Sequence, residues 1–229
     1  MLFSHILPFI TAYWPAVLVA VVAARLLRNK YHNGLHKYPG PWLAAYTDLW
    51  RFFESFNRRT ERTHIELHQK YGDIVRVGPS LLSFANPQAI KTIYGLNKGM
   101  VKSEFYPVQQ GIAQGRRLPS LFSTTDEDYH AKYRRCVNNA FAMSSLVTYE
   151  PLVDSTTDFF LKRTQELYAS TGKTCNFTEW LQFFAFDVVG ELTWSRRLGF
   201  LEKNMDVDGV VNFVSGFLTY ASVVCQLPL

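Results

Sequence analysis

Cysteine is scarce in this chain, and no spacing pairs the three that it contains. Cys136, Cys175 and Cys225 are an odd number in 229 residues, which argues against a disulfide framework and favours a reducing compartment. The sequence also lacks Cys-x-x-Cys, His-Glu-x-x-His and Gly-x-x-x-x-Gly-Lys, so zinc sites and phosphate-binding loops of those types are unsupported. We assign no metal ligand and no catalytic residue from such patterns.

Charge is absent from Met1 to Ala24, an otherwise apolar run. About 20 predominantly apolar residues suffice for a membrane-spanning helix. A secretory signal, cleaved near residues 20–24, is the main alternative. It is disfavoured because no positive residues precede the apolar run, whereas four follow it within residues 25–37. The positive-inside rule then predicts that residues 1–27 are an uncleaved transmembrane anchor with the remainder in the cytosol.

The net charge of +5 is unevenly distributed. Residues 25–76 contain ten Lys or Arg and five Asp or Glu, whereas the remainder of the chain contains fourteen of each. A basic stretch beside a hydrophobic segment favours attraction to the anionic cytoplasmic leaflet. A nucleic-acid binder would more often carry its basic excess on a folded recognition face. We therefore expect membrane lipid as a partner and no nucleic acid.

After the anchor, the sequence predicts a mainly helical fold with a small β-hairpin or sheet element. Lys37–Trp42 reads KYPGPW, a Pro-Gly-Pro hinge that cannot continue a helix, so we expect a basic hinge over residues 28–45 and a domain over 46–229.

A helix over residues 53–71 should end at Gly72, and a helix to about Tyr94 should begin after Asn86-Pro87. Other predicted elements are strands 74–77 and 81–84 at the edge of a larger sheet, helices 125–143, 150–170 and 178–194, and a last apolar helix that stops at Pro228.

Residues 97–122 form a long segment without clean periodicity, and a loop of that length is commonly functional or disordered. Its apolar and aromatic residues favour the wall of a binding cavity over disorder. The residues expected to line that cavity are Phe105, Tyr106, Leu118, Leu121 and Phe122.

The stretch DEDYHAKYRRC places two nitrogen donors one helical turn apart. Thr124 and Glu127 have capping-box spacing, so the helix should start near Thr125. His130 and Arg134 then share a face that apolar residues continue, which directs them toward a largely buried group. A guanidinium suits a carboxylate or phosphate because it can donate two parallel hydrogen bonds. An ordinary surface or core arrangement is the alternative.

Cys136 and Asn176 receive structural interpretations. Cys136 projects from another face of the same helix and is expected to be a small core residue. Asn176 begins an Asn-Phe-Thr sequon, which would be usable only in the lumen. Because the predicted topology places the domain in the cytosol, Asn176 is instead expected to cap the helix that follows it.

From KYPGPW onward the chain resembles the N-terminal half of a fungal microsomal cytochrome P-450, most closely the pisatin-demethylase-type branch. Three blocks carry the resemblance in the family's order and spacing: HQKYGDIVRVGPSLLSFANPQAIKTIYG, LFSTTDEDYHAKYRRCVNNAFAMSSL and FTEWLQFFAFDVVGELTWSRRLGFLE. The resemblance implies a partial cytochrome P-450 fold preceded by one transmembrane helix, at the endoplasmic reticulum membrane. It also implies a haem cofactor, an NADPH-cytochrome reductase as partner and a small apolar substrate.

The resemblance gives specific roles to the residues singled out above. His130 occupies the Trp position, and Arg134 the Arg position, of the family's Trp-x-x-x-Arg pattern, whose members donate hydrogen bonds to a haem propionate. Residues 103–122 match the family's first substrate-contacting region. Arg135 is not expected to be a propionate ligand, because it lies about 100° round the helix from Arg134.

Several family features have no counterpart in these 229 residues. No cysteine occupies the Phe-x-x-Gly-x-Arg-x-Cys-x-Gly setting of the haem thiolate, and Glu-x-x-Arg and the oxygen-activating helix are absent. We therefore expect a truncated monooxygenase that is inactive alone. The alternatives are a membrane-anchored binding protein that retains half of the fold, and an unrelated helical membrane protein whose basic patch recruits lipid or a partner.

Overall fold

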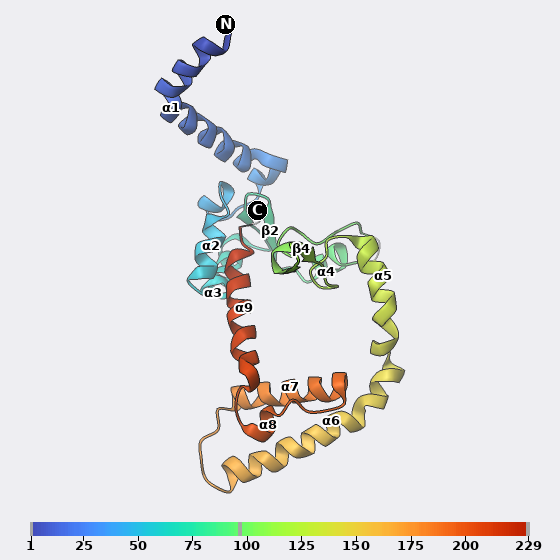
Figure 1. Ribbon diagram of the computed structural model, residues 1–229. Helices are drawn as coiled ribbons and strands as arrows, with labels where there is room; N and C mark the ends of the chain where they lie inside the picture. The colour runs from blue at the N-terminus through green and yellow to red at the C-terminus, as the bar shows by residue number, and fades with distance from the viewer. Residues whose placement is uncertain (1, 96–97, 228–229) are drawn as a thin grey trace. The chain divides into compact units, whose positions relative to one another are not determined.

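The computed structural model describes residues 2–95 and 98–227, with the backbone alone for residues 2–12. The chain divides into two compact units, Met1–Gly111 with Ser222–Leu229, and Ile112–Ala221. Figure 1 shows the order of the elements along the chain. The predicted fold class, mainly helical with a small β element, is confirmed. The predicted boundaries after residues 27 and 45 stay a prediction.

The first unit begins with α1, a helix over Leu2–Tyr31 that continues through the first basic residues. Two short 3-10 helices follow, η1 over His32–Lys37 and η2 over Leu43–Ala45. Between them the Pro-Gly-Pro segment lies against the backbone of the β-hairpin, where Arg76 donates its amide hydrogen to the Pro39 carbonyl at 2.7 Å. A Cβ atom at Gly40 would overlap the Arg76 carbonyl, so this close approach requires glycine.

The helix predicted over residues 53–71 is wrong as a single element. The structure has α2 over Leu49–Phe56 and α3 over Thr60–Tyr71. The chain turns between them because Arg58 adopts a left-handed conformation with φ of 54°, which no α-helix accommodates. The predicted end is confirmed, since Gly72 with φ of 91° follows the last residue of α3.

The predicted hairpin is confirmed as β1, Ile74–Gly78, antiparallel to β2, Leu81–Phe84. A register shift between Arg76 and Gly78 marks an irregularity, and Val75 and Val77 are buried. The expected larger sheet is not found in the described residues, where this sheet has two strands. Next comes α4, Gln88–Ile93, whose first amide donates to the side-chain oxygen of Asn86 at 2.9 Å, as predicted.

The segment expected to lack regular structure contains a 3-10 turn, η3, over Pro107–Gln109 and a second hairpin. Its strands are β3, Gly111–Ala113, and β4, Arg116–Leu118. Both residues between the strands, Gln114 and Gly115, have positive φ. This matches the two-residue turns that agree with strand twist, but Gln-Gly is a weaker turn signal than Asn-Gly, so the prediction missed it.

The helix predicted over residues 125–143 is shorter. It is α5, Glu127–Val137, followed by a 3-10 turn, η4, over Asn138–Phe141. The cap also differs, because the Asp126 carboxylate accepts the amide hydrogens of Asp128 and Tyr129 at 2.9 and 3.0 Å. Thr124 instead accepts from the Asp126 amide at 3.2 Å. The predicted capping box between Thr124 and Glu127 is therefore replaced by a cap at Asp126, the residue directly before Glu127.

The second unit has its core between α6, Met143–Thr164, and α7, Phe177–Trp194, which lies along α6 (Figure 1). Helix α6 starts seven residues before the predicted Glu150 and contains Pro151; a π-helical turn, η5, follows over Gln165–Ala169. The buried core is Trp180, Phe183, Phe200 and Leu201. Asn176 precedes α7, but its amide donates to Glu179 at 3.3 Å and makes no side-chain cap, so that prediction is wrong.

A buried carboxylate fixes the turn after α7. Asp187 accepts amide hydrogens from Gly199, Phe200 and Leu201 at 2.8, 3.2 and 2.9 Å. Gly199 is the N-cap residue of α8, Phe200–Lys203, and Phe200 and Leu201 are its first two residues. Three such bonds compensate for burying a carboxylate away from water.

The last elements are η6, Val207–Gly209, and α9, Val210–Val224. The predicted apolar helix is confirmed, while its predicted stop at Pro228 lies outside the described residues. Along α9 the large side chains are mostly exposed, for example Phe213 at 72% and Leu218 at 57%. An apolar helix that is not covered needs another partner.

Candidate functional site

Helix α5 presents the predicted nitrogen donors on an open face. His130 is half-buried and Arg134 is exposed, as is Phe141 further along. Among the described residues nothing in the same unit packs over this face of α5, although the helix itself begins at the Asp126 cap. The buried group that the pair is expected to face is not part of this chain, so the role of His130 and Arg134 stays a prediction.

Arg134 lines a surface hollow of about 430 Å³ together with Ala131, Arg135 and Asn138. Two guanidinium groups and an amide at one hollow, with no acidic lining residue, make it complementary to an anionic oxygen ligand. The 100° separation of Arg134 and Arg135 does not keep them apart, because their long side chains reach the same space. His130 is not among the lining residues, so the structure joins Arg134 with Arg135 rather than with His130.

Cys136 on the same helix is exposed, and its thiol donates to the Lys132 carbonyl at 3.4 Å. The expectation that it is a core residue is therefore wrong, since the α5 face that carries it is not covered. Cys175 is half-buried and Cys225 is buried, and all three thiols are free. Burial raises the pKa of the Cys225 thiol, which keeps it protonated at neutral pH.

Hydrogen bonds hold the turn that leads into α5, residues 119–126. Ser120 and Ser123 exchange hydrogen bonds, with each backbone amide donating to the other hydroxyl at 3.0 and 3.1 Å. The Tyr129 hydroxyl donates to the Pro119 carbonyl at 2.9 Å, and its ring stacks on Tyr133 at 4.3 Å. Burial, and after it the hydrogen bond with the Tyr133 side chain, raises the pKa of Tyr129. The hydroxyl therefore stays protonated and can donate. The turn is thereby tied to the first turn of α5.

Three of the five predicted cavity residues lie at this turn: Leu118 ends β4 directly before it, and Leu121 and Phe122 lie within it. Leu118 and Phe122 are 55% and 61% exposed, and Leu121 is half-buried. A rigid backbone that presents exposed apolar side chains is suited to contact an apolar ligand. The other two, Phe105 and Tyr106, belong to the first unit, where their rings meet edge to face at 5.6 Å. The shared cavity stays a prediction.

Sequence reasoning missed a cluster of polar contacts at the C-terminal end of α1. Arg76 is 2% exposed, and its guanidinium donates to the carbonyls of Lys30 and Asn29 at 2.8 and 2.7 Å. It also donates to the carbonyls of Ala45, Gly78 and Pro79 at 3.3, 3.2 and 2.8 Å. No carboxylate among the described residues pairs with it. Burial lowers the pKa of Arg76, but a guanidinium remains charged in proteins.

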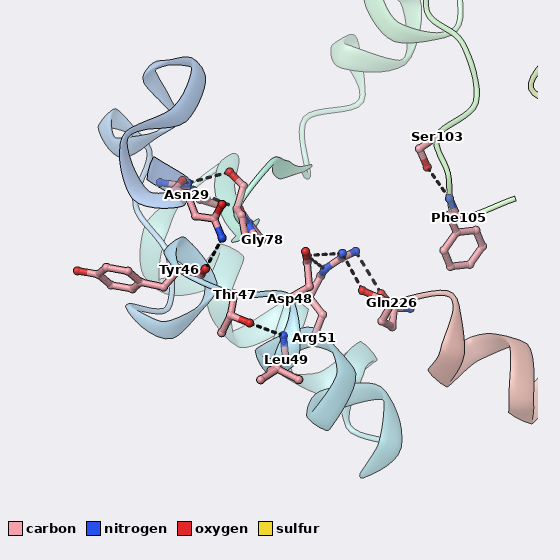
Figure 2. Close-up of polar contacts among 12 residues, drawn as sticks. Asn29, Tyr46, Thr47, Asp48, Leu49, Arg51, Gly78, Ser103, Phe105 and Gln226 are labelled. Carbon is pink, nitrogen blue, oxygen red and sulfur yellow. Dashed lines mark hydrogen bonds and ion pairs between the residues drawn. The ribbon is translucent and has the colours of Figure 1, made fainter. Parts of the chain in front are cut away.

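These bonds join α1 to the β-hairpin. The last carbonyls of a helix have no partners within the helix, and Arg76 supplies donors to two of them. The Asn29 amide adds a bond to the Tyr46 carbonyl at 2.7 Å, which Figure 2 shows. Nearby, Arg51 pairs with Asp48 at 2.5 Å and donates to the Gln226 side chain at 3.2 Å (Figure 2). Arg76 and its five carbonyl partners thus form a joint between α1 and the β-hairpin. Its only signal in the sequence is the single Arg within the strand pattern DIVRVG.

One helical stretch in the described residues, Val207–Val224, is long and apolar enough to cross a membrane. This is weak support for a span, because core helices meet the same criterion. The predicted anchor over residues 1–27 lies partly outside the described side chains, which begin at Tyr13. Its placement in a membrane stays a prediction.

Comparison with known proteins gives consistent matches. A family model described as Cytochrome P-450 matches residues 44–227. The cytochrome P-450 monooxygenase cicH of Emericella nidulans is 40% identical over 190 residues, 83% of this chain and 38% of the relative. A cytochrome P-450 monooxygenase of Aspergillus terreus is 35% identical over 226 residues, 99% of this chain and 45% of the relative.

A third relative, the cytochrome P-450 monooxygenase mpaDE of Penicillium brevicompactum, is 37% identical over 97% of this chain and 26% of its own length. The chain thus spans less than half the length of these curated relatives. No solved structure matches it. These matches do not test the pisatin-demethylase-type branch, which stays a prediction.

Proposed function

Because this chain belongs to the cytochrome P-450 family, we propose that it forms the N-terminal part of a haem-thiolate monooxygenase. The whole enzyme would oxidise a small apolar molecule of fungal secondary metabolism with molecular oxygen. Its electrons would come from an NADPH-cytochrome reductase. The observation that carries the proposal is the match over residues 44–227, which contains α5 and its cationic hollow.

The residues of α5 fit one part of a haem group. Arg134, with His130 one turn before it, would hold a propionate through charge-assisted hydrogen bonds. The lining of the hollow supports this role, since it offers donors and no carboxylate. When bound, haem would supply the oxygen chemistry, with its reactivity set by an axial thiolate. We assign that thiolate to none of Cys136, Cys175 and Cys225.

The remaining assignments follow from exposure and charge. Leu118, Leu121 and Phe122 would contact the apolar substrate from the rigid turn before α5. Residues 1–27 would anchor the chain in the endoplasmic reticulum membrane, with the domain in the cytosol and the basic residues after the anchor beside the lipid surface. Protease protection on microsomes tests this topology, and shielding of the domain from added protease would reverse it.

The cofactor assignment is tested by expressing the chain with added haem and recording the reduced carbon-monoxide difference spectrum. We expect no thiolate-type band from residues 1–229 alone. A thiolate-type band would contradict the cysteine assignment. A monodisperse protein that melts cooperatively without haem would instead favour the alternative, a membrane-anchored binding protein that retains half of the fold.

The propionate role is tested in a chain completed with the remaining part of a close relative. Arg134→Ala should lower haem retention by about 1.5–3 kcal/mol, because a buried carboxylate loses a charged donor. Arg135→Ala is the matched control from the same hollow and should retain haem. Equal retention by both variants would refute the role of Arg134, and equal loss would show that the two arginines share it.

A further inference from the structure

A small cavity lies where α1 meets the Pro-Gly-Pro segment. Its volume is about 80 Å³, enough for several water-sized groups, and Lys30, His36 and Arg76 contribute to its lining. The whole cavity belongs to the first unit. The structure therefore defines the positions of its lining residues relative to one another.

The charge around this cavity is positive and is not balanced locally. The first acidic residue of the chain is Asp48, and Arg51 holds it in an ion pair. The partners of Arg76 are carbonyl oxygens, which carry only partial negative charge. Lys30 has its ammonium 5.4 Å from the ring centroids of both Tyr31 and Tyr46. Hydrogen bonding to Tyr46 raises the pKa of Lys30, so the ammonium stays charged.

The surroundings of the cavity are aromatic and exposed. Trp42 is 77% exposed, Tyr31 56% and Tyr38 39%, and Trp42 and Tyr38 also line the cavity. Tyrosine and tryptophan are enriched where membrane proteins cross from the acyl region to the headgroups. These three residues lie within the 15 residues that follow the proposed spanning segment, residues 1–27. Their position favours a ligand that is attached to a lipid surface over one that is free in solution.

We propose that this cavity binds the phosphate of an anionic phospholipid headgroup. The phosphate oxygens would accept hydrogen bonds from the Lys30 ammonium and the His36 imidazole, next to the buried charge of Arg76. The rings of Tyr38 and Trp42 would lie at the level of the glycerol backbone. The site rests on the proposed anchor in residues 1–27, and it would hold the domain at a fixed depth against the membrane.

The test uses the full chain in nanodiscs of about four parts phosphatidylcholine to one part phosphatidylserine. Electron paramagnetic resonance measures the association of spin-labelled phosphatidylserine with the protein, relative to spin-labelled phosphatidylcholine. The wild type should select the anionic lipid about fivefold, as one well-placed cation provides. Lys30→Gln should abolish most of that selection. Arg62→Gln, an equal charge loss on the exposed surface of α3, should leave it unchanged.

Each outcome is decisive. No selection by the wild type, or equal reduction by Lys30→Gln and Arg62→Gln, would overturn the site in favour of diffuse attraction. Full suppression by millimolar inorganic phosphate in the same nanodiscs would assign the cavity to free phosphate and overturn the lipid. If neither spin-labelled lipid is immobilised, the proposed anchor itself fails, which separates that failure from the failure of the headgroup site.

Discussion

Replacing Arg76 with Met should loosen the joint between α1 and the β-hairpin. Met keeps much of the side-chain volume but has no hydrogen to donate. Two of the carbonyls that Arg76 satisfies, those of Gly78 and Pro79, form bonds that are buried. The other acceptors are part-buried, and water can replace the guanidinium there. Leaving two buried carbonyls without donors at about 1.5 kcal/mol each costs about 3 kcal/mol.

A local cost of about 3 kcal/mol corresponds to a roughly 100-fold larger open population of the joint. Amide hydrogen exchange of the full chain, read on peptides that cover residues 28–47 and 74–79, measures that population directly. Arg76→Lys should lie between the wild type and Arg76→Met, since an ammonium keeps the charge and three donors. The control is Arg62→Met on exposed α3. Exchange in Arg76→Met within about twofold of the control would refute the reasoning.

Two further predictions concern a buried carboxylate and a half-buried imidazole. Asp187→Asn should destabilise the second unit by about 2 kcal/mol, because the new NH₂ group would face a backbone amide that now donates to the carboxylate. Urea unfolding measures this loss, with Asp158→Asn as the exposed control. Equal unfolding midpoints for the two variants would contradict the prediction. Burial lowers the pKa of His64 from 6.5. Because the unfolded chain binds the proton more readily, neutral His64 contributes stability to α3 that is fully present above about pH 6.5. This contribution is lost as the pH falls below that value. Exchange of α3 amides at several pH values checks this, and His64→Gln should remove the slope; an unchanged slope would show that another group titrates.

Local patterns were sufficient to predict several elements of this fold. Alternation and turn residues located both strands of the first hairpin, and Gly72 and Asn86 marked the end and the start of two helices. Each of these features depends on contacts within a few residues, which the sequence displays directly. The order of the three family-like blocks likewise indicated the family that the comparisons then showed.

The candidate site was predicted only in part. The Trp-x-x-x-Arg-like spacing identified Arg134, but the sequence could not show that Arg135 reaches the same hollow. The reach of a side chain depends on its rotamer and on its neighbours. The sequence also predicted a core position for Cys136, which is exposed. Whether a helix face is covered depends on which other segments pack against it, and in the described residues nothing in the same unit covers α5 there.

Composition and order along the chain determined the helical class, the apolar N-terminal segment, the basic excess that follows it and the family. Tertiary structure alone decided what the isolated charged residues do. Arg76 looks like an exposed strand residue in DIVRVG, yet it is buried against five carbonyls from three separate stretches of chain. Asp187 stands in an apolar helix, yet it holds the three amides that begin α8. A buried charge is stable only where distant backbone groups converge on it, and that convergence is a property of the folded chain.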